Sequence, residues 1–403
     1  MNSDFARRRF LRYLAASPLI AAAQSLPARA ANEFWRDFAI SSADQALDIF
    51  DLEKMAKDNV PPAHWASLIG GTEGDLTVQA NRQGFTRFRL KPKRLVDTSK
   101  LDMSVTLFGR KWPTPIVIDP VSRLNAFHPD GETAVAAAAR KRNHLQIYAT
   151  LATHPIEEVL AARQEPVWAQ LYPTSDWAIT QGLVKKQEAA GCPVLVVTID
   201  NPSTMGRVTA ARGKQNDTRT CTDCHSTEPG GAYVRLPMFE GLDTTKLTAT
   251  TSNRLTWDLV PRLRDLTKMK IVLKGVMTGE DAALALKYKA DGIIVSNHGG
   301  RSEESGMSTI EALPEVVRAV GGHMPILIDS GFRRGTDIFK ALALGATAVC
   351  VGRPYVWGLA AYGEAGVDRA LQILTEEFKS AMISLGAPTI ASIDRSFLYE
   401  PPS

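Results

Sequence analysis

The sequence predicts an α/β fold, a TIM (β/α)8 barrel with an N-terminal helical extension and a long insertion after the fourth strand. Short apolar runs rich in β-branched residues alternate with longer stretches of helical spacing, which is typical of parallel strands joined by helices. The runs are apolar almost throughout, as expected for strands that are covered on both faces. Eight such units indicate that the sheet closes into a barrel.

The eight strands are predicted, in chain order, at residues 115–118, 145–149, 167–171, 194–199, 271–273, 292–296, 326–329 and 348–352. Most of the segments between them have amphipathic helical patterns, among them 132–141, 156–163 and 279–288. We therefore place the barrel at residues 101–383, the helical extension at 31–100, the insertion at 201–258 and a C-terminal tail at 384–403.

Residues 1–30 have the features of a twin-arginine signal peptide. Arg7 and Arg8 are followed by Phe10-Leu11, by an apolar stretch over 13–23 and by the small-x-small sequence Ala28-Arg29-Ala30. The alternatives are a basic amphipathic helix or a membrane anchor, but a spanning helix needs about 20 apolar residues. We expect the mature protein to begin near Ala31, to be periplasmic and not to span a membrane.

The composition is that of a globular protein, with 44% hydrophobic and 22% charged residues and a formal net charge of +4. Part of the positive excess lies in the arginine-rich N-terminal segment. The charge balance therefore gives no reason to expect binding of nucleic acid.

In a barrel of this kind, catalytic side chains follow the carboxyl ends of the strands. After the sixth predicted strand the sequence reads Ser296-Asn297-His298-Gly299-Gly300-Arg301. A lone histidine is often only a satisfied buried residue, but His298 at a strand end is a candidate general base. Arg301 has the forked guanidinium that binds a carboxylate, and the two glycines before it let ligands approach the backbone closely.

Glycines and arginines follow the last two predicted strands, in Asp329-Ser330-Gly331-Phe332-Arg333 and in Gly352-Arg353-Pro354. Loops at these two places form the usual phosphate site of this barrel, where backbone amides and arginine face the anion. The alternative is a pair of glycine-rich turns with surface arginines. Lys274, a cation at the end of the fifth strand, indicates a further anionic group. We therefore expect a phosphorylated cofactor in the barrel.

These residues resemble the FMN-dependent 2-hydroxy acid dehydrogenase and oxidase family, which includes glycolate oxidase, lactate oxidase and mandelate dehydrogenase. The resemblance runs from about residue 51 to residue 383 and rests on 296–301, 329–354, Lys274, 170–172 and 198–200. It implies FMN as cofactor, oxidation of an L-2-hydroxy acid to the 2-oxo acid, and a homotetramer. It also implies that the insertion at 201–258 forms a lid over the mouth of the barrel.

By position, the resemblance implies that His298 takes a proton from the substrate and that Asp200 stabilises the resulting imidazolium. Tyr172 would contact the substrate oxygen, Arg301 the substrate carboxylate, and Lys274 the N1 and O2 atoms of the flavin. The other implied cofactor contacts come from residues at or near strand ends: Pro120, Ser122, Thr150, Gln170, Thr198, Ser296, Asp329, Gly331, Arg333, Gly352 and Arg353.

Three positions depart from the family pattern, and all three concern the substrate. The tyrosine that contacts the substrate carboxylate in the family is replaced by Ser67 or Leu68. The second substrate arginine is represented by Arg207, one position off in either alignment. The loop beside flavin N5 carries Arg123, a candidate substitute for the lost contact. The substrate is therefore not assumed to be a small, unsubstituted hydroxy acid.

The sequence Cys221-Thr222-Asp223-Cys224-His225 matches the attachment motif of a c-type haem. In this motif two thiolates bind the porphyrin and the histidine becomes the proximal ligand of the iron. The chain has four cysteines, and we expect Cys192 and Cys350 to be buried packing residues. The alternatives for the motif are a disulfide, or a zinc site that lacks a second ligand pair.

Met238 is the candidate distal ligand of the haem iron, and hydrophobic packing is its alternative. With a haem, electrons would leave the flavin for a periplasmic cytochrome c or a respiratory-chain acceptor. Without one, the protein would be an FMN oxidase that uses oxygen and has a disulfide in its lid. A barrel that only binds a ligand is disfavoured by the presence of His298, Arg301, Lys274 and Asp200.

Overall fold

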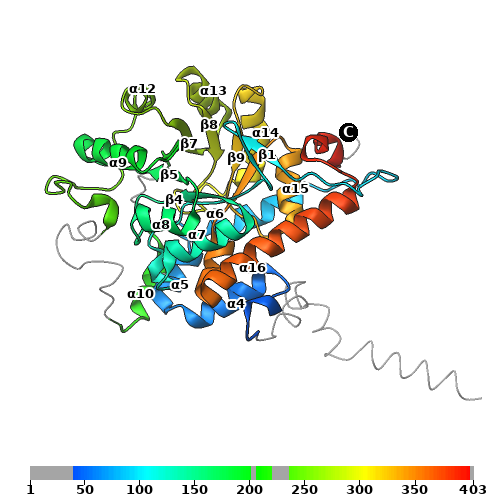
Figure 1. Cartoon of the computed structure of the whole chain (residues 1–403), viewed down its shortest axis with the longest axis horizontal. Helices are drawn as coiled ribbons and strands as arrows, with labels where there is room; N and C mark the ends of the chain where they lie inside the picture. Colours follow the sequence, from blue (N-terminus) through cyan, green and yellow to red (C-terminus); the bar gives the residue numbers. More distant parts are fainter. Residues whose placement is uncertain (1–39, 201–205, 220–235, 400–403) are drawn as a thin grey trace, which may run out of the picture. The chain divides into compact units, whose positions relative to one another are not determined.

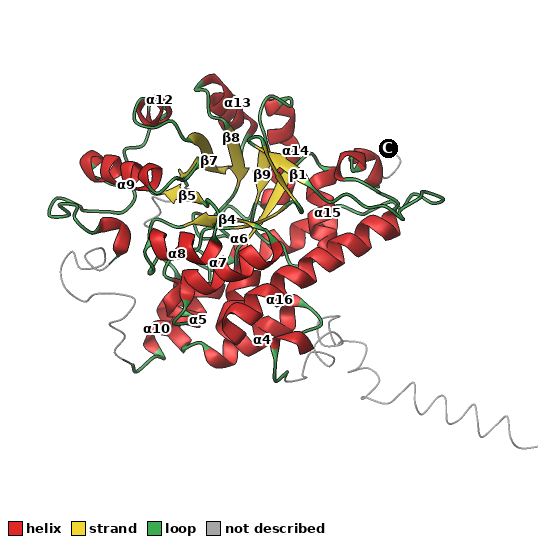
Figure 2. Cartoon of the chain, in the orientation of Figure 1, coloured by secondary structure: helices red, strands yellow, loops and turns green. Residues whose placement is uncertain are grey.

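The computed structural model describes residues 40–200, 206–219 and 236–399. The chain divides into two units, Met1–Ser41 and Ser42–Ser403, and the fold below is that of the second unit. Strands lie at its centre and helices surround them (Figure 1, Figure 2). The strands form a closed barrel, which confirms the predicted fold class.

All eight predicted strands are present and pair in parallel in the closed order β10-β3-β4-β5-β6-β7-β8-β9. Almost all of their residues are buried, which explains why the runs lack the alternation of half-exposed strands. Their bounds are β3 Ile116–Ile118, β4 Leu145–Tyr148, β5 Trp168–Leu171, β6 Val194–Thr198, β7 Lys270–Val276, β8 Gly292–Val295, β9 Ile326–Ile328 and β10 Ala348–Val351.

Strand β7 is longer than predicted, because it continues beyond Leu273. Lys274 and Val276 both pair with β8 across a register shift, and Gly275 between them has a φ of 115°. This backbone conformation favours glycine, which allows the irregular pairing to continue. The extension holds the charged Lys274 inside the sheet, where 3% of its surface is exposed.

The helices alternate with the barrel strands, and the predicted helix at 156–163 has those bounds in the structure. Helix α16 is kinked, because Tyr362 and Gly363 have non-helical backbone angles. The helices from β3 onward are α7 Gly131–Arg142, α8 Ile156–Arg163, α9 Trp177–Ala189, α10 Val208–Gln215, α12 Leu259–Arg264, α13 Gly279–Lys287, α14 Thr309–Val320, α15 Gly335–Ala343 and α16 Arg353–Leu385. Short 3-10 helices occur at η2 Ala43–Gln45, η3 Gly84–Arg87, η4 Leu124–Ala126, η5 Pro237–Phe239, η6 Ile390–Ser392 and η7 Arg395–Phe397.

A hairpin covers the amino-terminal end of the barrel. Its strands, β1 (Val105–Leu107) and β2 (Arg110–Trp112), pair in antiparallel fashion. Leu107 and Trp112 belong to the same buried cluster as the barrel residues Val196, Ile294 and Cys350. Side chains therefore fill the barrel from this end, and a cavity can open where the strands finish.

In the described residues that precede the barrel there are three α-helices: α4 (Ile49–Asn59), α5 (Pro62–Ile69) and α6 (Leu76–Gln83). They lie in the segment predicted to form the helical extension. Helix α4 packs against α16, and α5 packs against α10. None of the described helices combines the length and the apolar character needed to cross a bilayer.

Of the insertion at 201–258, the structure describes residues 206–219 and 236–258. Met238 is buried in η5, which packs against α9, and this agrees with the packing alternative for Met238. The motif from Cys221 to His225 lies outside the described residues. Cys192 and Cys350 are free and buried, as predicted.

Candidate active site

A cavity of about 960 Å³ lies at the carboxyl ends of the strands. Most of the predicted site residues line it, although they come from distant parts of the sequence. The lining includes Pro120, Ser122, Arg123, Gln170, Tyr172, Thr198, Arg207, Lys274, His298, Arg301, Asp329, Gly331, Arg333, Gly352 and Arg353. Thr150, Asp200 and Ser296 stand outside the lining and bind residues within it.

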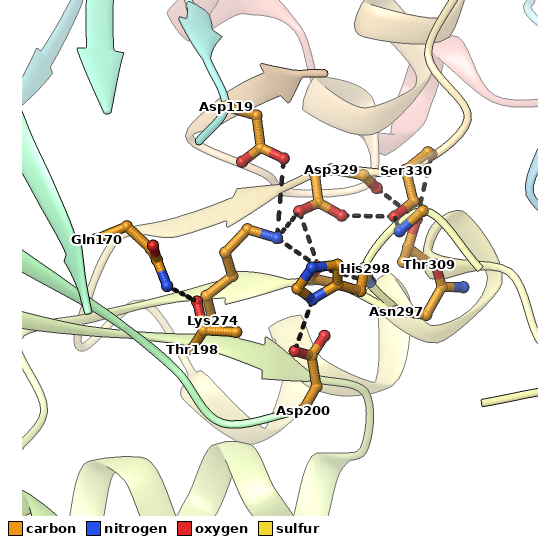
Figure 3. A network of polar contacts seen from close by, with 12 residues as sticks. Asp119, Gln170, Thr198, Asp200, Lys274, Asn297, His298, Thr309, Asp329 and Ser330 are labelled. Atoms are coloured by element: carbon orange, nitrogen blue, oxygen red, sulfur yellow. Dashed lines mark hydrogen bonds and ion pairs between the residues drawn. The ribbon is translucent and has the colours of Figure 1, made fainter. Parts of the chain in front are cut away.

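His298 is held between an acid and a phenol. Its Nδ1 lies 3.0 Å from Oδ1 of Asp200, and its Nε2 lies 3.3 Å from the Tyr172 hydroxyl (Figure 3 shows the bond to Asp200). Because an ionised carboxylate can only accept, Nδ1 carries the hydrogen and Nε2 is left as the basic atom. The structure therefore gives His298 the geometry of a general base with its carboxylate partner.

The position of His298 depends on an uncommon backbone angle. Its φ is 59°, in the left-handed region, and its amide donates to the Ser296 hydroxyl at 3.1 Å. The same hydroxyl accepts from Lys274 and donates to Asp329. Ser296 therefore holds His298, Lys274 and Asp329 in position. The sequence predicted Ser296 only as a cofactor contact.

Lys274 lies among carboxyl groups on the wall of the cavity (Figure 3). Its Nζ contacts Asp329 and lies 2.9 Å from the Ser296 hydroxyl and 3.8 Å from Oδ2 of Asp119. Burial lowers the pKa of Lys274, but the carboxylates of Asp119, Asp329 and Asp200 raise it by more. The amine therefore stays protonated and can face an anion in the cavity.

Gln170 is fixed on a second wall of the cavity by two neighbouring strand ends. Its Oε1 accepts from the Thr150 amide at 3.0 Å, and its Nε2 donates to the Thr198 hydroxyl at 2.9 Å. The Thr150 hydroxyl donates to the Gln170 carbonyl and accepts from the Tyr172 amide. This network holds the predicted ring-binding groups and Tyr172, the predicted substrate contact, in one rigid arrangement.

Four guanidinium groups converge on the cavity with no carboxylate partner among the described residues. They donate instead to backbone carbonyls, and Nε of Arg207 is buried without a hydrogen-bond partner in the described structure. The carbonyl acceptors belong to Ser67 for Arg207 and Arg301, to Phe332 for Arg333, and to Leu68, Ile69, Gly70 and Gly299 for Arg353.

The four arginines are buried close together, and their positive charges oppose one another. Burial and the neighbouring Arg207 and Arg353 lower the pKa of Arg301 well below its ordinary value. Burial, with Arg353 nearby, lowers the pKa of Arg333 to about 9. Such mutual repulsion is relieved when phosphate or carboxylate groups lie between the guanidiniums. The residues present therefore fit a cofactor with a phosphate and a substrate with a carboxylate.

The structure also shows where the three positions that depart from the family pattern lie. Ser67 lies on α5, and its backbone carbonyl accepts from both Arg207 and Arg301. Arg207, at the start of α10, reaches the cavity and joins Arg301 there. Arg123 also lines the cavity, with a left-handed φ of 58°. The arginine positions predicted for the substrate thus come together at one site.

A buried carboxylate, Glu132 on α7, organises two of the loops around the cavity. It accepts from the amides of Leu124 and Thr153, from the Thr153 hydroxyl and from Nδ1 of His154 at 2.9 Å. Burial raises the pKa of Glu132, but the hydrogen bonds from His154 and Thr153 lower it below its ordinary value. Glu132 thereby fixes the loop that carries Arg123.

Sequence reasoning missed Asp119, Asn81 and Asn297. Asp119 directly follows the first predicted strand, so its position at a strand end was the available signal. Asn81 and Asn297 exchange two amide hydrogen bonds of 2.8 and 2.9 Å between α6 and the loop after β8 that carries His298. No local pattern indicates that pair, because its members are far apart in sequence.

A barrel with a candidate base and buried arginines at its strand ends fits the class of enzymes that hold a phosphorylated cofactor. Residues 56–400 match the family model described as FMN-dependent dehydrogenase. The chain belongs to that family, and FMN is its cofactor. This agrees with the resemblance predicted from the sequence.

Relatives and solved structures agree with this assignment. The chain is 37% identical to an L-lactate oxidase from Nostoc sp. over 90% of its own length and 99% of the relative. It is also 37% identical to glycolate oxidase 1 from Oryza sativa subsp. indica, over 88% and 96%. A soluble mutant of (S)-mandelate dehydrogenase from Pseudomonas putida has a TM-score of 0.80 and 34% identity, covering 89% and 100%.

Proposed function

We propose that the protein oxidises an L-2-hydroxy acid to the 2-oxo acid and passes the electrons to a haem c bound by Cys221, Cys224 and His225. The observation that carries the oxidation is the His298–Asp200 pair beside Arg301 and Arg207. His298, Arg301 and Arg207 line one cavity, which supports a base and two carboxylate-binding groups acting on the same substrate. The named relatives, which are lactate and glycolate oxidases and mandelate enzymes, support a 2-hydroxy acid as substrate.

The chain's own residues divide the work of the reaction. Arg301 and Arg207 bind the substrate carboxylate, which orients the carbon to be oxidised. Tyr172 holds the substrate oxygen, and Nε2 of His298 receives the proton. Asp200 then stabilises the imidazolium through Nδ1. The bound FMN supplies the acceptor for two electrons.

Other residues would hold the cofactor. Arg333 and Arg353 would bind its phosphate, together with the backbone of Gly331 and Gly352. Lys274 would face the part of the ring that gains negative charge, and Gln170 and Thr198 would hydrogen-bond its edge. Pro120 and Ser122 would lie against the ring.

The haem proposal is supported by two sequence features that are independent of each other. The motif from Cys221 to His225 has the spacing of covalent haem attachment, and the twin arginine at Arg7 and Arg8 predicts export to the periplasm. A haem would accept electrons singly and deliver them to a periplasmic cytochrome c or a respiratory-chain acceptor.

A second candidate function is an FMN oxidase without haem, in which Cys221 and Cys224 form a disulfide. The names of two relatives, L-lactate oxidase and glycolate oxidase, favour this alternative. The two functions differ in their electron acceptor and share the same oxidation of the substrate.

Anaerobic mixing with L-lactate, glycolate, (S)-mandelate and L-2-hydroxy acids of increasing size tests the oxidation. We expect at least one to bleach the flavin absorbance and, where that acid is chiral, its opposite enantiomer to fail. A flavin that none of them reduces would reject the assignment.

A visible spectrum of protein exported by its native host tests the haem. We expect a sharp α-band after reduction and a haem that remains attached during denaturation. Flavin bands alone, with oxygen consumption during turnover, would establish the oxidase instead.

The double variant Arg7→Lys with Arg8→Lys tests the export signal. It should retain the precursor in the cytoplasm, since lysine lacks the guanidinium fork. Normal periplasmic amounts of the variant would reject that export route.

A further inference from the structure

Asp119 is a second carboxyl group facing the amine of Lys274. It follows β3 directly, and its Oδ2 lies 3.8 Å from Nζ of Lys274 on the cavity wall (Figure 3). Its other oxygen, Oδ1, is buried without a hydrogen-bond partner in the described structure. The proposed reaction gives Asp119 no part, yet burying an unpaired carboxyl oxygen costs free energy.

The first carboxyl group at Lys274, that of Asp329, already has its partners. Its Oδ2 accepts from Lys274 and from the Ser296 hydroxyl, and its Oδ1 accepts from the Ser330 hydroxyl. The carboxylate of Asp329 alone thus balances the positive charge of Lys274. Asp119 is therefore a surplus acid in a buried site.

The titratable groups around Asp119 come from several elements of the barrel. Lys274 on β7 favours its ionised form, while Asp329 after β9 and Asp200 after β6 oppose it. Cys350 on β10 and Tyr355 on α16 complete the surroundings, and the Tyr355 hydroxyl donates to the Asp119 carbonyl at 2.9 Å. Burial, with the two other acids, raises the pKa of Asp119 well above its ordinary value.

We propose that Asp119 tunes the reduction of the bound flavin, by placing a titratable carboxyl group beside the lysine that faces the cofactor. An anion at this place offsets the charge of Lys274 and so disfavours the gain of electrons by the ring. Conversely, electrons on the ring strengthen the hold of Asp119 on a proton, so flavin reduction is coupled to proton uptake. This inference rests on FMN binding in the cavity, which the flavin spectrum of the same sample measures.

The test is the midpoint potential of bound FMN in the whole protein, measured against reference dyes from neutral to alkaline pH. In Asp119→Asn the carboxylate charge is absent at every pH. At alkaline pH we expect the reduction equilibrium of this variant to be about tenfold more favourable than in the wild type, which is about 30 mV for a two-electron couple. At lower pH the two proteins should converge, because Asp119 is then protonated.

The wild type should also show a steeper fall of potential with pH over the range in which Asp119 titrates, and Asp119→Asn should lack it. Asp368→Asn is the matched control, since Asp368 is a buried acid paired with Arg142 and Lys141 on the outside of the barrel. Its potential should follow the wild type at every pH.

Equal potentials for the wild type and Asp119→Asn, with flavin bound to both, would overturn the role of Asp119 and leave the proposed function intact. Wild-type protein without flavin would overturn both. If Asp119→Asn does not fold, the wild-type curve decides alone: a curve with no steeper range overturns the inference, and one with it supports the inference.

Discussion

Gly275 and Asp200 lie in such close contact that a Cβ on residue 275 would stand 2.5 Å from the Asp200 Cβ. Real side chains do not approach so closely, so the carboxylate that partners His298 depends on a glycine in the neighbouring strand. The φ of 115° at Gly275 also disfavours any other residue there.

We therefore expect Gly275→Ala to displace Asp200 and with it the imidazole of His298. Displacement of catalytic groups by about 1 Å can reduce turnover about a hundredfold. Steady-state kinetics with flavin content measured in parallel checks this. Gly109→Ala is the control, because Gly109 also has a positive φ but has open space around it. Full activity in Gly275→Ala would contradict the positioning role.

His298→Gln should retain FMN and lose turnover, because the base is removed while the phosphate loops stay unchanged. The loss should be about two to four orders of magnitude. Stopped-flow reduction of the flavin measures it, and His323→Gln, at an exposed position, serves as control. Flavin reduction at the wild-type rate would refute the assignment of the base.

Arg333→Gln should weaken cofactor binding, because a buried guanidinium at the phosphate loop is lost. A hydrogen bond to a charged group contributes about 1.5–3 kcal/mol, so the dissociation constant of FMN should rise about 10- to 150-fold. Arg334→Gln is a matched control, since Arg334 itself pairs with Asp48 and Glu377 outside the cavity. Equal FMN affinities for the two variants would exclude Arg333 from the phosphate site.

Replacement of Cys221 and Cys224 by alanine separates the two acceptor proposals. If these residues carry haem, flavin reduction by substrate should be nearly unchanged and reoxidation by cytochrome c should slow strongly, since the one-electron relay is lost. If they form a disulfide, substrate binding should weaken with no specific loss of electron transfer. Stopped-flow measurement of each half-reaction distinguishes the outcomes, and an unimpaired oxidative half-reaction would reject the relay.

Stability should fall at alkaline pH because of the pair formed by Glu132 and His154. The hydrogen bond with Glu132 raises the pKa of His154 above its ordinary 6.5. The folded state thus binds this proton more tightly, so the contribution is complete below pH 6.5 and is lost as pH rises through the raised pKa. Thermal unfolding should show a larger alkaline fall in Tm for the wild type than for His154→Gln. Parallel curves would count against the pair.

The barrel and the centre of the site could be predicted because their signals are local. Each buried strand appears as a short apolar run. Lys274 follows such a run directly, and His298 and Arg333 lie in the loops just after two others. Strand β7 was predicted too short, because a charged residue ended the apolar run. Only the structure reveals that Lys274 remains paired in the sheet, with Gly275 allowing the register to shift.

The substrate side was less predictable, since it depends on how distant segments pack. Replacement of the family tyrosine near Ser67 was read from the sequence as a lost contact. The structure adds that the Ser67 carbonyl holds Arg207 and Arg301, which follows from the position of α5 against α10. A backbone carbonyl leaves no trace in residue type, so this contact could not be found from the sequence.

The reciprocal amide pair of Asn81 and Asn297 has a consequence for how the molecule can be divided. Each side chain supplies the donor and the acceptor that the other needs, so an aspartate at either position would leave an acceptor facing an acceptor. Helix α6 and the loop after β8 that carries His298 therefore depend on each other through this pair. A chimera that takes its first helices from a relative will keep His298 in register only if the exchange preserves an amide at both positions.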